Sequence, residues 1–173
     1  MYPVRRAALA IATALAATAL IGAAPAQAAS ATKNLTFDVD LTSSGTVLET
    51  LPGDITYGWN DLSGPTRWGK QAASMRFLGS VDYVSGTGPF GGLVTITRAD
   101  GTKIGLSVSG WATSPSDEAG TANATFRGTV TIIGGTGPYA GATGTGTMKG
   151  YRKSALGSPV ELTFALTVSR PRA

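Results

Sequence analysis

A sixteen-residue pattern occurs twice in this chain, at residues 77–92 and at residues 126–141, and the two copies agree at eight positions. In each copy, about eight residues of alternating character lead into the sequence Gly-Thr-Gly-Pro followed by an aromatic residue. Glycine tolerates positive φ, while proline fixes φ near about −65° and removes a backbone donor. This sequence is therefore typical of a tight turn. The repeat predicts one device used twice: a strand, a tight turn and the next strand.

Polar and apolar side chains also alternate along residues 35–42, 103–109 and 160–169, as expected for strands with one buried face. After residue 28, no segment shows the period of a ten-residue helix, although residues 69–77 could form one or two helical turns. We therefore expect an all-β chain with seven or eight strands.

Turn signals place several connections between these strands. Residues 99–101, with the sequence Ala-Asp-Gly, predict a hairpin turn, and residues 43–45 are expected to end the first strand. Residues 142–151 form a strand whose inward face carries almost no bulk, because it presents mainly alanine and glycine. Phe126 and Phe164 are expected to fill the space opposite this strand.

The first 28 residues have the features of a secretory signal peptide. Two arginines at positions 5 and 6 precede an apolar stretch at residues 7–23, and Ala-Gln-Ala at residues 26–28 fits a cleavage site. A membrane anchor is the weaker interpretation, because the stretch is rich in alanine and a proline follows it at once. We expect a secreted, extracellular protein in which residues 29–173 form one domain, with no membrane attachment after cleavage.

Composition excludes several classes of function. The chain has no cysteine and no histidine, so it lacks thiolate and imidazole ligands for zinc or copper, and it has no Ser-His or Cys-His pair. Twelve of the 14 Lys and Arg residues lie after residue 28, scattered among 10 Asp and Glu residues. That distribution gives no reason to expect a nucleic-acid partner. The Gly-Thr-Gly turns lack the Gly-Lys-Ser/Thr of a phosphate-binding loop. We expect no metal and no cofactor.

Residues 100–110 and 126–144 resemble the allene oxide cyclase and dirigent barrel family, in which a strand ending in Gly-Gly-Thr/Ser-Gly, an aromatic residue and a later glycine leads into the next strand. The resemblance extends over about residues 69–168. It implies a single antiparallel β-barrel of about eight strands with an apolar cavity, here in a secreted member of bacterial type. Members of the family cyclise a fatty-acid-derived epoxide or steer the coupling of phenoxy radicals, and they often form dimers or trimers. A homo-oligomer is therefore an expectation as well.

Eight strands close around an interior that is either filled with side chains or able to hold one small ligand. The residues leave both interpretations open. In the first, the barrel binds a small hydrophobic or aromatic molecule and, if it is an enzyme, acts as a cofactor-free cyclase or isomerase, or as a dirigent-like steering protein. In the second, a filled barrel serves as a non-catalytic extracellular module for structure or interaction.

Residues 51–70 fit strand patterning least and contain two tryptophans. These aromatic and polar side chains could rim a cavity; alternatively, the tryptophans plug one barrel end and polar groups cap a turn at residues 61–64. Trp111 is a third candidate for either end. The candidate ligand-binding residues are the phenylalanines expected inside the barrel together with this segment's aromatic and polar side chains: Phe37, Tyr57, Trp59, Asn60, Asp61, Arg67, Trp68, Phe77, Phe126 and Phe164.

The catalytic residues stay unknown, although Asp54 and Asp61 remain possible acids. In the cyclases a carboxylate on an early strand reaches the cavity, whereas alternation here directs Asp38, Asp40 and Asp82 toward solvent. Asn34 and Asn123 begin glycosylation sequons, which matter only in a eukaryotic secretory pathway. Because the leader looks bacterial, we expect both sequons to be incidental.

Overall fold

The computed structural model describes residues 30–115, 124–153 and 158–171. The expected signal peptide and Asn123 lie outside these described residues. Across the described ranges, no helix has the length and apolar character needed to cross a membrane.

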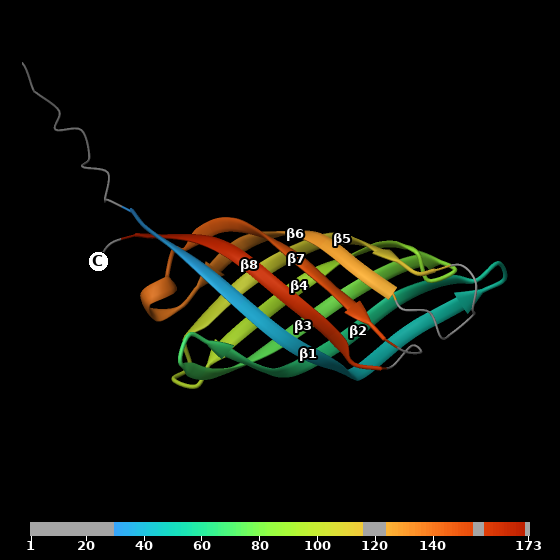
Figure 1. Cartoon of the computed structure of the whole chain (residues 1–173), viewed down its shortest axis with the longest axis horizontal. Coiled ribbons are helices and arrows are strands. Elements are labelled where there is room, and N and C mark those ends of the chain that lie inside the picture. The colour runs from blue at the N-terminus through green and yellow to red at the C-terminus, as the bar shows by residue number, and fades with distance from the viewer. Residues whose placement is uncertain (1–29, 116–123, 154–157, 172–173) are drawn as a thin grey trace, which may run out of the picture.

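Eight strands form one closed barrel in which each strand pairs antiparallel with its neighbours in the chain (Figure 1). The all-β barrel predicted from the sequence is confirmed. The strands are β1 (Ser30–Leu51), β2 (Ile55–Trp68), β3 (Gln71–Val84), β4 (Gly88–Arg98), β5 (Lys103–Thr113), β6 (Ala124–Gly135), β7 (Thr143–Arg152) and β8 (Val160–Pro171), with a short 3₁₀ helix η1 (Gly137–Tyr139) between β6 and β7.

β1 closes the barrel because its two halves pair with different strands. Residues 30–41 pair with β8, and residues 42–51 pair with β2. The register shifts between Ser43 and Gly45, where β1 passes from one partner to the other. The expectation that residues 43–45 end the first strand was therefore wrong: the polar Ser-Ser-Gly sequence forms an irregularity inside a long strand, as β-bulges do at bends of a sheet.

The repeated sequence forms strand, turn and strand in both copies, as predicted, through the β3–β4 and β6–β7 connections. Because β3 and β6 run in opposite directions around an antiparallel barrel, the two turns lie at opposite ends. The first turn is short, with positive φ at Ser85 and Gly86. The second contains η1 and is longer. The expected helical turns at residues 69–77 are wrong, since β3 begins directly after the two-residue connection that follows Trp68.

The two ends of the barrel are named here by their connections. The closed end holds the β2–β3, β4–β5 and β6–β7 connections, together with the start of β1 and the end of β8. The open end holds the β1–β2 and β3–β4 turns, the end of β7 and the start of β8. The predicted hairpin at residues 99–101 is confirmed and lies at the closed end.

The glycines of β7 allow its neighbour β8 to lean over the barrel interior. A Cβ at Gly146 would lie 2.7 Å from Cδ2 of Leu166, and one at Gly150 would lie 2.5 Å from Cδ2 of Leu162. The two phenylalanines that were expected opposite this strand are both buried. Phe126 pairs with Gly150 across β6 and β7, and Phe164 pairs with Met148 across β7 and β8.

Candidate functional site

The closed end is filled by aromatic rings. Trp68, at the end of β2, meets Phe37 edge to face with ring centres 5.6 Å apart, and it packs against Tyr139 of η1 at 4.8 Å. The guanidinium carbon of Arg98 lies 5.7 Å from the centre of the Trp68 ring, and that of Arg170 lies 5.0 Å from the centre of the Tyr139 ring. All three rings are buried. They form a plug of aromatic rings at this end of the barrel.

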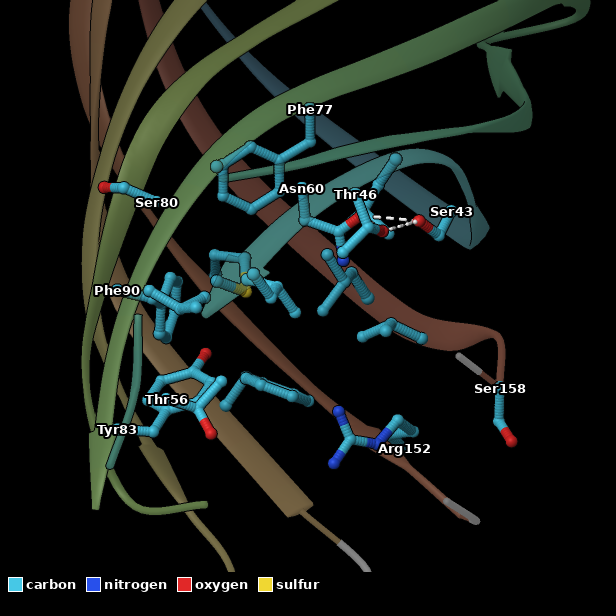
Figure 2. Close-up of a pocket in the computed structure, with 18 residues that line it drawn as sticks. Ser43, Thr46, Thr56, Asn60, Phe77, Ser80, Tyr83, Phe90, Arg152 and Ser158 are labelled. Carbon is cyan, nitrogen blue, oxygen red and sulfur yellow. Dashed lines mark hydrogen bonds between the residues drawn. The ribbon is translucent and has the colours of Figure 1, made fainter. Parts of the chain in front are cut away.

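The open end is hollow. It contains a cavity of about 220 Å³ whose lining is mainly apolar and comes from β1, β2, β3, β4, β6, β7 and β8 (Figure 2). An apolar cavity of about 150 Å³ suffices for benzene, while pockets for drug-sized ligands begin near about 300 Å³. The space at the open end therefore suits a molecule of one or two fused rings.

Three phenylalanines from the repeated sequence form an aromatic wall of the cavity. Phe77 and Phe126 are the first residues of the two copies, and Phe90 is the aromatic residue that ends the first turn sequence. Phe90 and Phe126 meet edge to face, with ring centres 5.8 Å apart. Rings in this arrangement offer apolar area and oriented edges to a second aromatic molecule.

A small polar group interrupts the apolar lining where β1 bends. The Oδ1 atom of Asn60 accepts hydrogen bonds from Oγ of Ser43 at 2.6 Å and from Oγ1 of Thr46 at 3.1 Å. These bonds fix the orientation of the Asn60 amide, and Figure 2 shows its nitrogen directed into the pocket. The cavity thus presents one amide donor held in place by the irregular part of β1.

Tyr83 and Arg152 are the ionisable side chains among the described residues that line the cavity, and none of those residues is acidic. Burial raises the pKa of Tyr83 to about 12, while the charge of Arg152 opposes this rise. Burial also lowers the pKa of Arg152, although a guanidinium stays protonated at neutral pH. Figure 2 shows the Arg152 guanidinium pointing into the pocket toward the side on which Tyr83 lies.

The structure distributes the ten candidate residues from the sequence over three environments. Three of them line the cavity, namely Asn60, Phe77 and Phe126. Three others are buried toward the middle and closed end of the barrel, namely Phe37, Trp68 and Phe164. The remaining four lie on the outer face, namely Tyr57, Trp59, Asp61 and Arg67.

The four outer residues share one cause, which is the alternation of β2. Thr56, Asn60 and Leu62 line the cavity from this strand, and the two residues that flank Arg67 are buried. The side chains that alternate with these inward residues therefore point outward. Asp61 pairs with Arg76 on the outside of the barrel, with oxygen and nitrogen 2.6 Å apart, and this partner lowers the pKa of Asp61. The turn expected at residues 61–64 is therefore wrong, since these residues lie within β2.

The predicted outward direction of three acidic residues is confirmed. Asp38, Asp40 and Asp82 are exposed, and Oγ1 of Thr163 donates to Oδ1 of Asp38 at 2.7 Å on the outer face. Trp111 is also exposed, on the outer face of β5, so it plugs neither end. In the part of the chain that the structure describes, no three acidic side chains gather as a metal site would require.

Several cavity residues were missed in the sequence, among them Phe90, Tyr83 and Arg152. A signal for Arg152 was present, since Met148 already marks the inward face of β7 and two further steps of two residues reach position 152. Along β3, steps of two residues from the inward Phe77 reach Tyr83 in the same way. Charged residues are rarely buried, so strand alternation alone does not single out Arg152 as a cavity residue.

Comparisons with known proteins support the fold. No protein-family model matches the chain, and no curated protein matches it either. Among solved structures, the pterocarpan synthase dirigent protein GePTS1 is similar with a TM-score of 0.50 and 14% identity, over 83% of this chain and 92% of that one. The dirigent protein PsPTS1, also a pterocarpan synthase, aligns with a TM-score of 0.41 and 15% identity, over 85% and 99% of the two chains. The chain thus has a dirigent-like barrel fold.

Proposed function

We propose that this protein binds a small aromatic or hydrophobic molecule in the cavity at the open end and steers its reaction by holding it in one conformation. The observation that carries the proposal is the mainly apolar cavity of about 220 Å³ at the open end of the barrel. A cavity lined mainly by apolar side chains, with few polar groups at fixed positions, is the usual form of a small-molecule site. The likeness to a dirigent protein supports an aromatic ligand.

Confinement is the mechanism that the lining favours. The described cavity residues include no carboxylate that could abstract a proton, whereas rings and aliphatic groups surround the space from several strands. Fixing a flexible or reactive molecule in one geometry reduces the number of products that it can form and removes part of the entropic barrier. The same restraint would serve a cofactor-free cyclisation or isomerisation, which we include in the proposal.

A binding measurement with 2-naphthol tests this function. The compound has two fused rings and one hydroxyl group, and we expect saturable binding to the purified protein by isothermal titration calorimetry. Val160→Phe should abolish that binding, because Val160 lines the cavity and the added ring would occupy it. Ile133→Phe makes a similar enlargement at an exposed position and should leave binding unchanged. Equal binding by both variants, or none by the wild type, would overturn the proposal.

We further propose that the protein is exported, with residues 1–28 removed as a signal peptide and residues 29–173 forming the mature domain. The n-region, apolar stretch and Ala-Gln-Ala sequence support this. Sequencing the amino terminus of protein recovered from the culture medium should give Ala29 first. Retention in the cell with an intact amino terminus would contradict export.

An interaction surface is a second candidate function, and the outer face of the barrel favours it. Val47 and Trp59 lie opposite each other on β1 and β2, and Leu78 and Leu93 do so on β3 and β4. All four are exposed, which is more apolar surface than isolated exposed residues provide. Self-association through this face is tested by light scattering: Trp59→Ser should shift an oligomer toward monomer, and a monomeric wild type would contradict it.

A further inference from the structure

Two positively charged residues lie directly opposite each other on the outer face of the barrel. Arg127 of β6 pairs in register with Lys149 of β7, and both side chains are exposed. The ion pairs formed between described residues include neither of them. Like charges at directly opposite positions destabilise a sheet, so this pair lowers the stability of the isolated barrel. A negatively charged partner that binds both side chains would offset that cost.

A tryptophan extends this row of side chains by one strand. Trp111 of β5 lies directly opposite Arg127, and 53% of its surface is exposed. The three residues therefore follow one another across the neighbouring strands β5, β6 and β7 (Figure 1), with about 4.8 Å between strands. Tryptophan and arginine are among the residue types that contribute most binding energy at interfaces. The row combines a flat apolar ring with two cations.

Arg127 and Lys149 also line one side of an open groove of about 460 Å³ on the outer face. On its other side, β8 and β1 carry the carboxylates of Glu161, Asp38 and Asp40. Carboxylates accept hydrogen bonds from neutral hydroxyl groups, but they repel a uniformly anionic chain such as a nucleic acid. The groove therefore fits a partner that brings both hydroxyl groups and negative charges.

We propose that this outer face binds an acidic polysaccharide, with a sugar ring stacked on Trp111 and carboxylates bound by Arg127 and Lys149. The inference goes beyond the proposed function, because these three side chains lie outside the cavity. An indole offers flat apolar area to the C–H face of a sugar ring. The planar guanidinium holds a carboxylate through two parallel hydrogen bonds, and the ammonium adds a second charge one strand away.

The inference is tested with polygalacturonate and with the same polymer after full methyl esterification, which keeps the sugar rings and removes the charges. In calorimetric titrations at low ionic strength, we expect the wild-type protein to bind the acidic polymer about tenfold or more tightly than the ester. Added salt should weaken the binding of the acidic polymer and leave that of the ester unchanged. Equal affinities for the two polymers, or no binding of either, would overturn the inference and leave the proposed function standing.

Two double variants separate the row from the general charge of the surface. Arg127→Gln combined with Lys149→Gln should remove the preference for the acidic polymer. Lys70→Gln combined with Lys103→Gln is the matched control, because it removes two exposed positive charges at the closed end, and it should keep the preference. Thermal unfolding establishes that each variant is folded. A preference lost in both double variants, or kept in both, would contradict the proposed site.

A matched pair of tryptophan variants tests the stacking contact. Trp111→Ala should weaken the binding of both polymers by about tenfold, whereas Trp59→Ala removes an exposed ring from β2 and should leave binding unchanged. Equal weakening in the two variants, or none in either, would overturn the inference. A DNA duplex should bind more weakly than polygalacturonate, because the groove also carries carboxylates. Tighter binding of DNA would overturn the assignment to a polysaccharide.

Discussion

The two ends of this barrel are built from the same repeated sequence, yet one is plugged and the other is hollow. Phe90 and Tyr139 are the corresponding aromatic residues of the two copies. At the closed end the longer turn forms η1, which places Tyr139 against Trp68. At the open end the turn is short, and Phe90 enters β4 as part of the cavity wall. The difference shows that the same Gly-Thr-Gly-Pro sequence followed by an aromatic residue can either fill a barrel end or line a cavity, depending on the conformation of the turn.

The largest change in stability is expected when Trp68 is replaced, and the other tryptophan of β2, Trp59, provides the comparison. Trp68→Ala should lower the free energy of unfolding by about 3 to 5 kcal/mol, because it empties the plug against Phe37 and Tyr139. Trp59→Ala removes an exposed ring and should change that free energy by no more than about 0.5 kcal/mol. Urea denaturation measures both. Similar losses of unfolding free energy in the two variants would contradict the conclusion that Trp68, and not Trp59, belongs to the plug.

The stability of the protein at alkaline pH tests whether water is excluded from the Tyr83 hydroxyl at the open end. The pKa of Tyr83 rises from 10.0 to about 12 on folding, so between these pH values the folded state retains a proton that the unfolded state has lost. The contribution of the Tyr83 proton to the free energy of unfolding is complete below about pH 10 and is lost as the pH rises to about 12. The free energy of unfolding should fall by about 2 to 3 kcal/mol over this range. Denaturation across this range measures it.

Tyr83→Phe serves as the control for the alkaline transition, since it keeps the ring and removes the titrating hydroxyl. Its stability should fall less steeply between pH 10 and 12 than that of the wild type. In ultraviolet titrations, the late ionisation of Tyr83 in the wild type should be missing from the variant. An identical titration curve for the two proteins near about pH 12 would mean that water reaches the Tyr83 hydroxyl freely.

The smallest difference in stability is expected between two variants that each replace one valine of β8 with phenylalanine, one toward each end of the barrel. Val168 lies on the inward face of this strand toward the closed end and is completely buried, so Val168→Phe should overpack that end and cost about 1 to 3 kcal/mol. Val160→Phe places the same ring in the cavity and should cost less. The two free energies of unfolding, measured side by side, test the asymmetry. Equal costs would indicate that the open end is as tightly packed as the closed one.

The sequence predicted the barrel well, because its evidence is local to each strand. Leu35 and Phe37 point inward while Asp38 and Asp40 point outward, as alternation requires. The strand β2 was harder to predict from the sequence, because its glycine, proline and polar residues interrupt the alternation of polar and apolar side chains. Once β2 is known to be a strand, the outward direction of Tyr57 and Trp59 follows from that of Asn60.

The cavity itself could not be predicted from strand patterns. Its existence depends on how far side chains from opposite strands extend across the interior, which involves pairs such as Phe77 and Leu162 that are distant in the sequence. The irregularity of β1 at Ser43 and Gly45 was also hidden, because the same polar residues are typical of a turn. That irregularity brings Ser43 and Thr46 to Asn60 and so determines the polar group in the cavity.

The central claim is that only the open half of the barrel accepts a ligand. A crystal structure of the protein soaked with 2-naphthol tests it most directly. The account predicts electron density for two fused rings beside Phe77, Phe90 and Phe126, with the Trp68 plug at the closed end undisturbed. Side chains that fill the space at the open end, or a ligand bound only on the outer face, would contradict it.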